Sequence, residues 1–302
     1  MPVSFLTEEA GRRVTPFVDA SMVLRISAFD RVLAKACGGT YEELSKRLAS
    51  GKWGMPRTID AVVEIEFQPK VATGNAANVV AILPGEDPEL SREWIVLSAH
   101  YDHLGLVAVG SDSDRVYNGA DDNASGCAAV LEVARRLAAG PPLRRSVLIL
   151  FTSGEEPGLL GALHYSLHPL VEPAQVVCDI NLDMVGRSDG TAFAIAAVSS
   201  DLFEAAVKAS EASGIRLLPD AYPAKRLIYF VDSFAFARAG VPAIEYFTAM
   251  HADYHQPSDE AGKIDYDRLA MITRAAEDLA ALYGQGNARP LYAPPPWFIV
   301  PE

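Results

Sequence analysis

The stretch Ile95–Asn123, IVLSAHYDHLGLVAVGSDSDRVYNGADDN, joins a strand pattern to a dense set of metal-binding residue types. Its start, the apolar run Trp94–Leu97, predicts a strand buried on both faces. His100 and Asp102 follow directly, where the carboxyl edge of a sheet is expected to bind ligands. Imidazole with carboxylate suits Zn²⁺ and similar divalent ions. A lone loop acid is more often a solvated or capping residue, so the interpretation depends on the rest of the chain.

The composition is that of a globular protein and excludes several functional classes. Of the 302 residues, 50% are hydrophobic and 22% are charged, and the length fits one large domain, alone or with an appendage. No apolar run approaches the roughly 20 residues that cross a bilayer. The net charge of −13 leaves no basic stripe for phosphates, so we expect no nucleic-acid partner. The oligomeric state is left open.

The cysteines and the amino terminus carry little information on location. Cys37, Cys127 and Cys178 form no CxxC pair and are too few for a disulfide framework. The first 20 residues lack a basic region followed by an apolar core, so no secretory signal is predicted. The localisation is therefore unknown from the sequence.

The chain is expected to divide into an appendage, residues 1–70, and a catalytic domain, residues 71–302. Within the appendage, Thr40–Glu43 fits a capping box for a helix that ends near Ser50. The β-branched run Ala61–Phe67 predicts a strand. No residue of this segment suggests chemistry.

From about residue 76 onward, strand and helix patterns alternate. Strands are expected over 77–83, 94–99, 146–151, 176–182, 192–198 and 242–247, and helices after residue 125 and over 159–168, 200–213 and 266–283. Such alternation predicts a mostly parallel mixed sheet between two helical layers, a three-layer α/β/α fold.

Acids and histidines follow three of the expected strands and form a fourth cluster near the carboxyl end. They are His100 and Asp102, Glu155 and Glu156, Asp183, and the segment His251–Pro257. Metal ligands from distant parts of the chain that gather at one sheet edge are what a two-metal hydrolase requires.

Five motifs in this order resemble peptidase family M28, the zinc aminopeptidases that include the glutamate carboxypeptidase branch. The motifs are Ser98–His103, Gly119–Gly126, Gly154–Gly158, Asn181–Gly186 and Tyr254–Pro257. The resemblance covers about residues 76–284. It implies a zinc-exopeptidase (phosphorylase/hydrolase-like) fold and a metal-dependent exopeptidase that removes amino-terminal residues from peptide substrates.

The resemblance also implies a site with two Zn²⁺ ions. Its residues would be His100 and Asp183 on one ion, Glu156 and His255 on the other, Asp121 bridging both, Glu155 as general base and Asp102 as the partner of His100. A carboxylate has two oxygens, so one Asp suffices to bridge ions about 3.5–4 Å apart. Co²⁺ or Mn²⁺ would suit the same donors.

Other histidines and one motif departure receive a different interpretation. His103, His164 and His168 are interpreted as packing or surface residues, and His255 is preferred over His251 as the ligand. The family has a His after the acid at Asp232, but this chain has Ser233, a departure that concerns the pocket rather than the metals.

Three alternatives stay open. A carboxypeptidase or dipeptidase of the same fold would need a basic pocket, for which Arg187 or Lys225–Arg226 are candidates. A glutaminyl cyclase would use one zinc, whereas all five expected ligands are present. A receptor-like domain without activity would have lost ligands.

Residues 20–70 resemble the closing part of a protease-associated domain, which often precedes this catalytic domain. We therefore expect either a reduced lid or a late start within a longer, exported protein. Side-chain preference is left open.

Overall fold

The computed structural model describes residues 30–31, 34, 38–50, 74–106 and 114–298. The chain divides into two compact units, Met1–Asn75 and Ala76–Glu302. In the first unit, helix α2 spans Tyr41–Ala49. The Thr40 amide donates to Glu43 Oε2 at 3.0 Å and the Glu43 amide donates to Thr40 Oγ1 at 3.3 Å, which confirms the capping box. The expected strand over 61–67 lies outside the described residues, and the likeness to a protease-associated domain stays a prediction.

The second unit is built on a seven-stranded sheet with the order β1-β3-β2-β4-β7-β5-β6. The strands are β1 (Val79–Leu83), β2 (Trp94–His100), β3 (Ser146–Thr152), β4 (Val176–Leu182), β5 (Thr191–Ile195), β6 (Arg216–Pro219) and β7 (Ala243–Phe247). Strands β3, β2, β4 and β7 run parallel, and so do β5 and β6. Only the β1–β3 and β5–β7 pairs are antiparallel. The predicted mostly parallel mixed sheet is confirmed.

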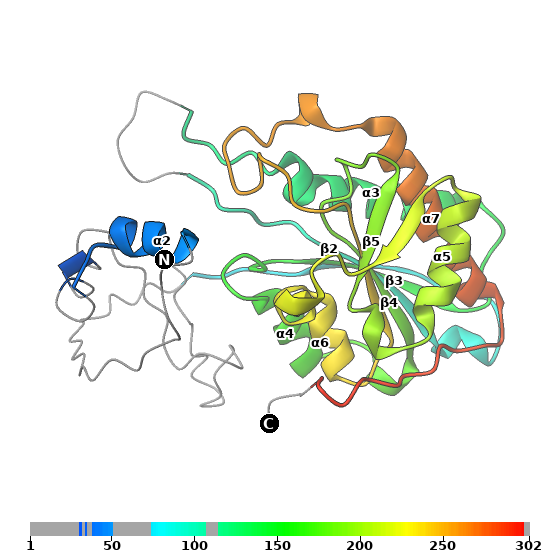
Figure 1. Cartoon of the computed structure of the whole chain (residues 1–302). Helices are drawn as coiled ribbons and strands as arrows, with labels where there is room; N and C mark the ends of the chain where they lie inside the picture. Colours follow the sequence, from blue (N-terminus) through cyan, green and yellow to red (C-terminus); the bar gives the residue numbers. More distant parts are fainter. Residues whose placement is uncertain (1–29, 32–33, 35–37, 51–73, 107–113, 299–302) are drawn as a thin grey trace. The chain divides into compact units, whose positions relative to one another are not determined.

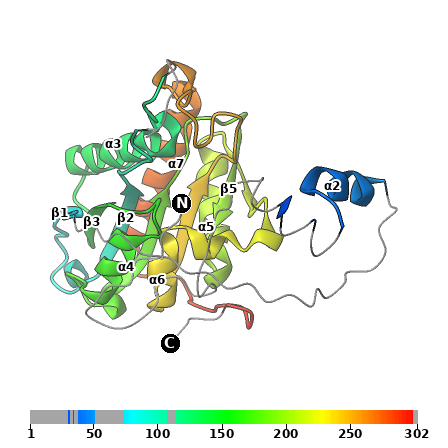
Figure 2. The ribbon, with the colours of Figure 1, turned by 90° about the vertical axis from the view of Figure 1, so that its left-hand side faces the viewer.

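Helices cover both faces of the sheet, as Figures 1 and 2 show. Helices α3 (Gly126–Ala139), α5 (Leu202–Ala212) and α7 (Tyr266–Gln285) lie on one face, and α4 (Leu160–Leu167) and α6 (Ser233–Arg238) on the other. Within the described residues, these elements are joined by one π-type turn, Ala120–Ser125, and by short 3₁₀ helices. The 3₁₀ helices are Leu90–Arg92, Pro173–Gln175, Ala197–Ser199, Pro223–Lys225, Leu227–Phe230 and Ala261–Lys263. The arrangement is the expected three-layer α/β/α fold.

The centre of the sheet is buried because most residues of its strands are apolar. Ile95, Val96 and Leu97 of β2 have no exposed surface. Burying a side chain of this size contributes about 1.5–3 kcal/mol relative to leaving it in water. The expected strand 192–198 ends earlier, at Ile195, since Ala196 has a φ of 62° and a short 3₁₀ helix follows.

Strand order brings the chemically important loops to one edge of the sheet. His100 at the end of β2 pairs in register with Thr152 at the end of β3, and Ser98 pairs with Asn181 near the end of β4. Strand β7 lies beside β4 and ends at the same edge. The loops that follow these four parallel strands therefore meet.

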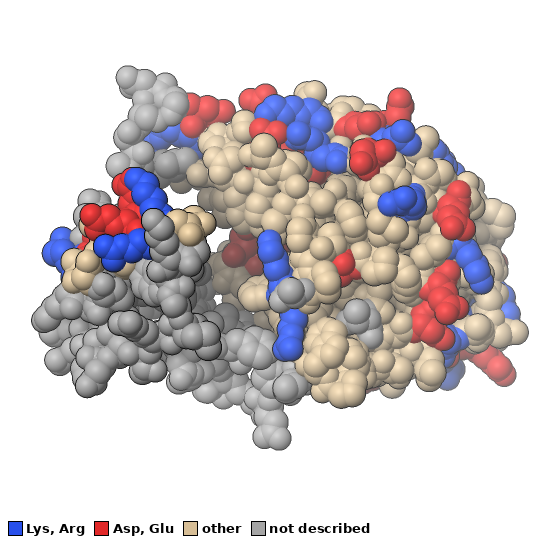
Figure 3. All heavy atoms as spheres, in the orientation of Figure 1, with Lys and Arg blue, Asp and Glu red and all other residues tan. Residues whose placement is uncertain are grey.

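Two further observations concern possible partners. Among the helices of the described residues, none is long and apolar enough to cross a membrane. On the face shown in Figure 3, Lys and Arg side chains stand among Asp and Glu and form no continuous basic patch over the second unit.

Candidate metal centre

His100, Asp122 and Asp183 form the first group of candidate ligands. His100 Nε2 lies 3.3 Å from Asp122 Oδ1 and 3.4 Å from Asp183 Oδ1. On the other side of the ring, Nδ1 donates to the backbone oxygen of Asp102 at 3.1 Å and lies 3.7 Å from its carboxylate. This contact fixes the tautomer, so the lone pair of Nε2 faces the two acids.

Asp122, Glu156 and His255 form the second group. His255 Nε2 lies 3.2 Å from Asp122 Oδ2 and 3.1 Å from Glu156 Oε2. His255 follows the carboxyl end of β7, and Glu156 follows β3. The two oxygens of Asp122 thus face different groups, and this residue lies between them.

The structure places Asp122 where the sequence analysis expected Asp121. The Asp121 carboxylate is turned away, because its Oδ1 accepts the Gly186 amide at 2.6 Å and its Oδ2 lies 3.1 Å from His251 Nε2. The buried Asp259 carboxylate accepts the amides of both Asp121 and Asp122 and holds this backbone in place. Asp121 therefore contacts the loops around the site, and the carboxylate that lies between the two groups is that of Asp122.

The donor atoms have the spacing that bound zinc requires. Around a tetrahedral ion with bonds of about 2.0–2.1 Å, ligand atoms lie about 3.3–3.4 Å apart. The four nitrogen–oxygen separations of the two groups are 3.1–3.4 Å. In addition, Asp183 Oδ1 is buried and accepts no hydrogen bond. The residues present fit two divalent ions.

The electrostatics of the groups point the same way. Burial alone would lower the pKa of His100, but Asp183, Asp102 and Asp122 outweigh it and raise that pKa. Burial alone would also lower the pKa of His255, but Asp122 and Glu156 outweigh it and raise that pKa to about 9. Both imidazoles respond to a surplus of negative charge, which divalent cations would neutralise.

Glu155 lies beside both groups without joining either. Its backbone amide donates to Asp102 Oδ1 at 3.1 Å. Asp102 therefore contacts both the loop after β3 and the ring of His100. Burial, together with the charges of Asp232 and Asp183, raises the pKa of the Glu155 carboxyl well above its usual range. A carboxylate of raised pKa beside a metal group is suited to accept a proton.

Two histidines near the centre were not predicted to have a role. His103 Nδ1 lies 2.6 Å from Glu156 Oε1, although the sequence suggested a packing or surface residue. His251 contacts Asp121, as described above. Only the loop position of His103, three residues after His100, could have signalled its contact. His164 and His168 are exposed, as expected, and their rings lie 4.7 Å apart.

Buried acids continue beneath the centre. Thr152 Oγ1 donates to Asp232, whose pKa is raised to about 6 by burial and by neighbouring Asp183 and Asp102. Ser233, at the departure from the family motif, donates to Asp179 Oδ2 at 3.1 Å. Ser233 thus contacts a buried acid that belongs to neither of the two ligand groups.

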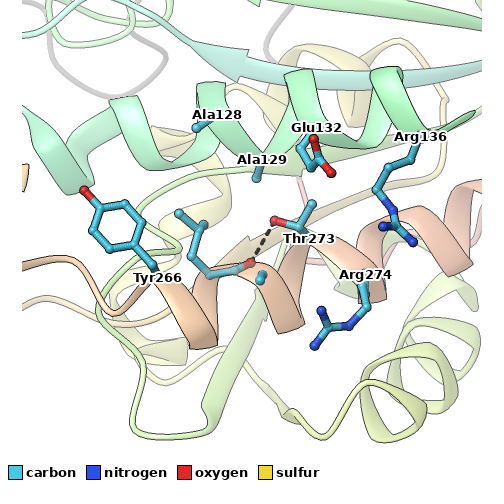
Figure 4. A pocket seen from close by; sticks show the side chains of 9 residues that line it. Ala128, Ala129, Glu132, Arg136, Tyr266, Thr273 and Arg274 are labelled. Carbon is cyan, nitrogen blue, oxygen red and sulfur yellow. Dashed lines mark hydrogen bonds between the residues drawn. The ribbon is translucent and has the colours of Figure 1, made fainter. Parts of the chain in front are cut away.

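A separate groove of about 230 Å³ lies between α3 and α7 (Figure 4). Ala128, Glu132 and Arg136 line it from one helix, and Tyr266 and Arg274 line it from the other. None of the predicted site residues is among its lining.

Comparison with known proteins agrees with the fold and the motifs. The family model described as peptidase family M28 matches residues 78–280. A "Probable zinc metalloprotease" of Pyrenophora tritici-repentis is 29% identical over 256 residues, 72% of this chain and 51% of that protein. The chain therefore spans about half the length of the curated relatives that it matches.

Two solved structures share the fold. A zinc aminopeptidase from Bacillus subtilis superposes with a TM-score of 0.58 at 23% identity, covering 70% of this chain and 51% of that one. A glutaminyl cyclase from Porphyromonas gingivalis gives 0.54 at 21% identity, with 67% and 76% covered. The fold is thus common to proteins of different activities, whereas the family model covers most of the second unit. The chain belongs to peptidase family M28.

Proposed function

We propose that the chain is a metal-dependent aminopeptidase with a dinuclear zinc centre. One observation carries this proposal: Asp122 directs one carboxylate oxygen toward His100 and the other toward His255. A carboxylate that faces two separate histidine–acid groups is the arrangement that a bridging ligand requires.

The residues that would hold the ions follow from the two groups. His100, Asp122 and Asp183 would bind the first ion, and Asp122, Glu156 and His255 the second. When bound, two such ions supply Lewis acidity for the scissile carbonyl and lower the pKa of water toward about 7. Co²⁺ or Mn²⁺ would supply the same chemistry to these donors.

Glu155 would act as the general base. It would take the proton from the attacking water and return it to the leaving amine. Asp102, which accepts the Glu155 amide, would keep the carboxylate within reach of the water.

The charges around the centre favour cleavage at the amino end of the substrate. Arg187, a candidate for binding a substrate carboxylate, pairs instead with Asp253 at 3.0 Å. Lys225 and Arg226 lie over the rings of Tyr222 and Trp297. An acid-rich site beside which Arg187 already pairs with Asp253 suits a substrate ammonium group better than a carboxylate.

One observation favours a second candidate, a carboxypeptidase or dipeptidase of the same fold. Arg187 Nη1 is buried and makes no hydrogen bond, so this nitrogen could donate a hydrogen bond to a substrate carboxylate. The Asp253 pairing would then orient the arginine rather than occupy it.

Three sets of substrates distinguish these candidate activities. We expect zinc-loaded protein to hydrolyse aminoacyl chromogenic amides and peptides with a free amino group, and to leave their acetylated forms intact. Cleavage confined to amino-blocked peptides with a free carboxyl end would contradict the aminopeptidase and support the second candidate. Peptides with amino-terminal glutamine test for cyclisation, and loss of ammonia without peptide hydrolysis would contradict both.

A further inference from the structure

We propose that His103 is a positioning residue for Glu156: its imidazole binds one carboxylate oxygen, so that the other is presented to the second ion. The proposal rests on the dinuclear centre proposed above and adds a residue to it. His103 lies in the loop after β2, and Glu156 lies in the loop after β3.

The distances separate a hydrogen bond from a shared metal ion. His103 Nδ1 lies 2.6 Å from Glu156 Oε1, which is shorter than the 3.3–3.4 Å or so between two ligands of one zinc. From the same nitrogen to Asp122 Oδ2 the distance is 3.8 Å, which is longer than that spacing. His255, in contrast, lies 3.1 Å from the other oxygen, Glu156 Oε2. His103 and His255 therefore hold different oxygens of Glu156. The ligand atoms of His103, Asp122 and Glu156 lie within 4.8 Å of one another, but the 2.6 Å contact between His103 and Glu156 is that of a hydrogen bond, whereas His255 has the spacing of a ligand to both acids.

The direction of the hydrogen bond follows from the carboxylate. An ionised Glu156 can only accept, so His103 Nδ1 must carry the proton. His103 Nε2 is buried and has no hydrogen-bond partner. A neutral ring with its proton on Nδ1 leaves only a lone pair at that buried position. A charge-assisted bond of this kind is stronger than one between neutral groups.

The surroundings hold the ring in place. Its centroid lies 6.3 Å from that of Tyr117 and 5.8 Å from that of His255, both edge to face. On a third side it contacts Gly119, where an added Cβ would come within 2.8 Å of His103 Cγ. The glycine of the Gly119–Gly126 motif thus leaves the space that the imidazole fills.

This arrangement makes the two ion groups depend on different supporting contacts. The first ligand histidine, His100, is oriented by Asp102, whereas Glu156 in the second group is oriented by His103. Loss of such an outer contact typically weakens metal binding about 10–100-fold. The loss of His103 should therefore weaken one of two sites.

The test is zinc titration of the chelator-treated full chain against a competing chelator, with His103→Phe, His103→Asn and the remote His164→Phe. Wild type and His164→Phe should bind two equivalents alike. His103→Phe keeps a ring but removes the donor, so its second equivalent should bind about 10–100-fold more weakly while the first is unchanged. The free-zinc dependence of kcat should shift by the same factor. His103→Asn, whose amide can replace Nδ1–H, should recover most of the affinity.

Four results would overturn the role. Unchanged binding of the second equivalent in His103→Phe would do so and would leave the dinuclear centre standing. Equal weakening of both sites, or the same loss in His103→Asn as in His103→Phe, would point to a general structural effect instead. Circular dichroism of the metal-free variants shows whether each one folds. A wild type that binds one equivalent would overturn the dinuclear centre, and this role with it.

Discussion

The adjacent glutamates after β3 have different surroundings although they share one loop. Glu156 contacts both His103 and His255 and is nearly buried, with 7% of its side chain exposed. Glu155 makes no such contact and carries a raised pKa. These differences support the proposal that Glu156 is a ligand and Glu155 the general base.

Substitution should separate the two roles. Glu155→Gln removes the basic oxygen and leaves all ligands in place, so kcat should fall about 10²–10⁴-fold while both zinc equivalents stay bound. Glu156→Gln should lose affinity for one ion and show activity that depends on added zinc. Metal content and kcat at limiting and saturating zinc distinguish them. The assignments are reversed if Glu155→Gln is the variant that loses metal.

At the scale of single residues, the sequence predicted the residue types at the centre but not every position. His100, Glu156, Asp183 and His255 lie together as expected, because each follows a strand that ends at the same edge. The sequence suggested Asp121 as the bridging acid, whereas in the structure its chemically identical neighbour Asp122 faces both histidines. Only the backbone of the loop, held by distant partners, decides which of the two carboxylates faces the histidines.

At the scale of elements, long apolar runs were predicted well and short elements were missed. The expected strand 176–182 coincides with β4, because Val176, Val177, Cys178, Ile180 and Leu182 make most of this segment apolar. Strand β6 has four residues and helix α6 has six. Segments this short have little stability of their own and depend on packing against neighbours, which local sequence does not record.

Strand β4 carries a buried acid whose titration should affect stability. Asp179 has no exposed surface, accepts hydrogen bonds from Ser98 and Ser233, and has its pKa raised by burial from 3.8 to about 7. Between these values the folded protein binds more protons than the unfolded chain. The contribution of Asp179 to the free energy of unfolding is therefore greatest below about pH 4, and this contribution is lost as the pH rises to about 7.

Asp179→Asn tests this link, because an amide imitates the neutral acid. In metal-free protein, the unfolding free energy of wild type should fall relative to the variant by up to about 1.4 kcal/mol per pH unit between about pH 4 and 7. Urea denaturation across this range measures the difference. A constant difference between the two proteins would show that Asp179 does not titrate there.

At the scale of the whole molecule, one unit supplies the entire proposed centre. All candidate ligands, from His100 to His255, lie within Ala76–Glu302. The chain carries a net charge of −13, and several of its acids gather at the sheet edge, where two divalent ions would offset them. Metal binding should therefore change the stability as well as the activity of the full chain, because ions that bind only the folded state favour it.

The central claim is that Asp122 bridges two ions, and zinc titration of the chelator-treated chain tests it most directly. Wild type should bind two equivalents, and hydrolysis of an aminoacyl amide should rise with their binding. Asp122→Asn should weaken both equivalents, because it removes a ligand from each group. Asp121→Asn should keep both, because its carboxylate contacts Gly186 and His251 instead. A single equivalent at full activity, or loss of both ions in Asp121→Asn with Asp122→Asn unaffected, would contradict the proposed centre.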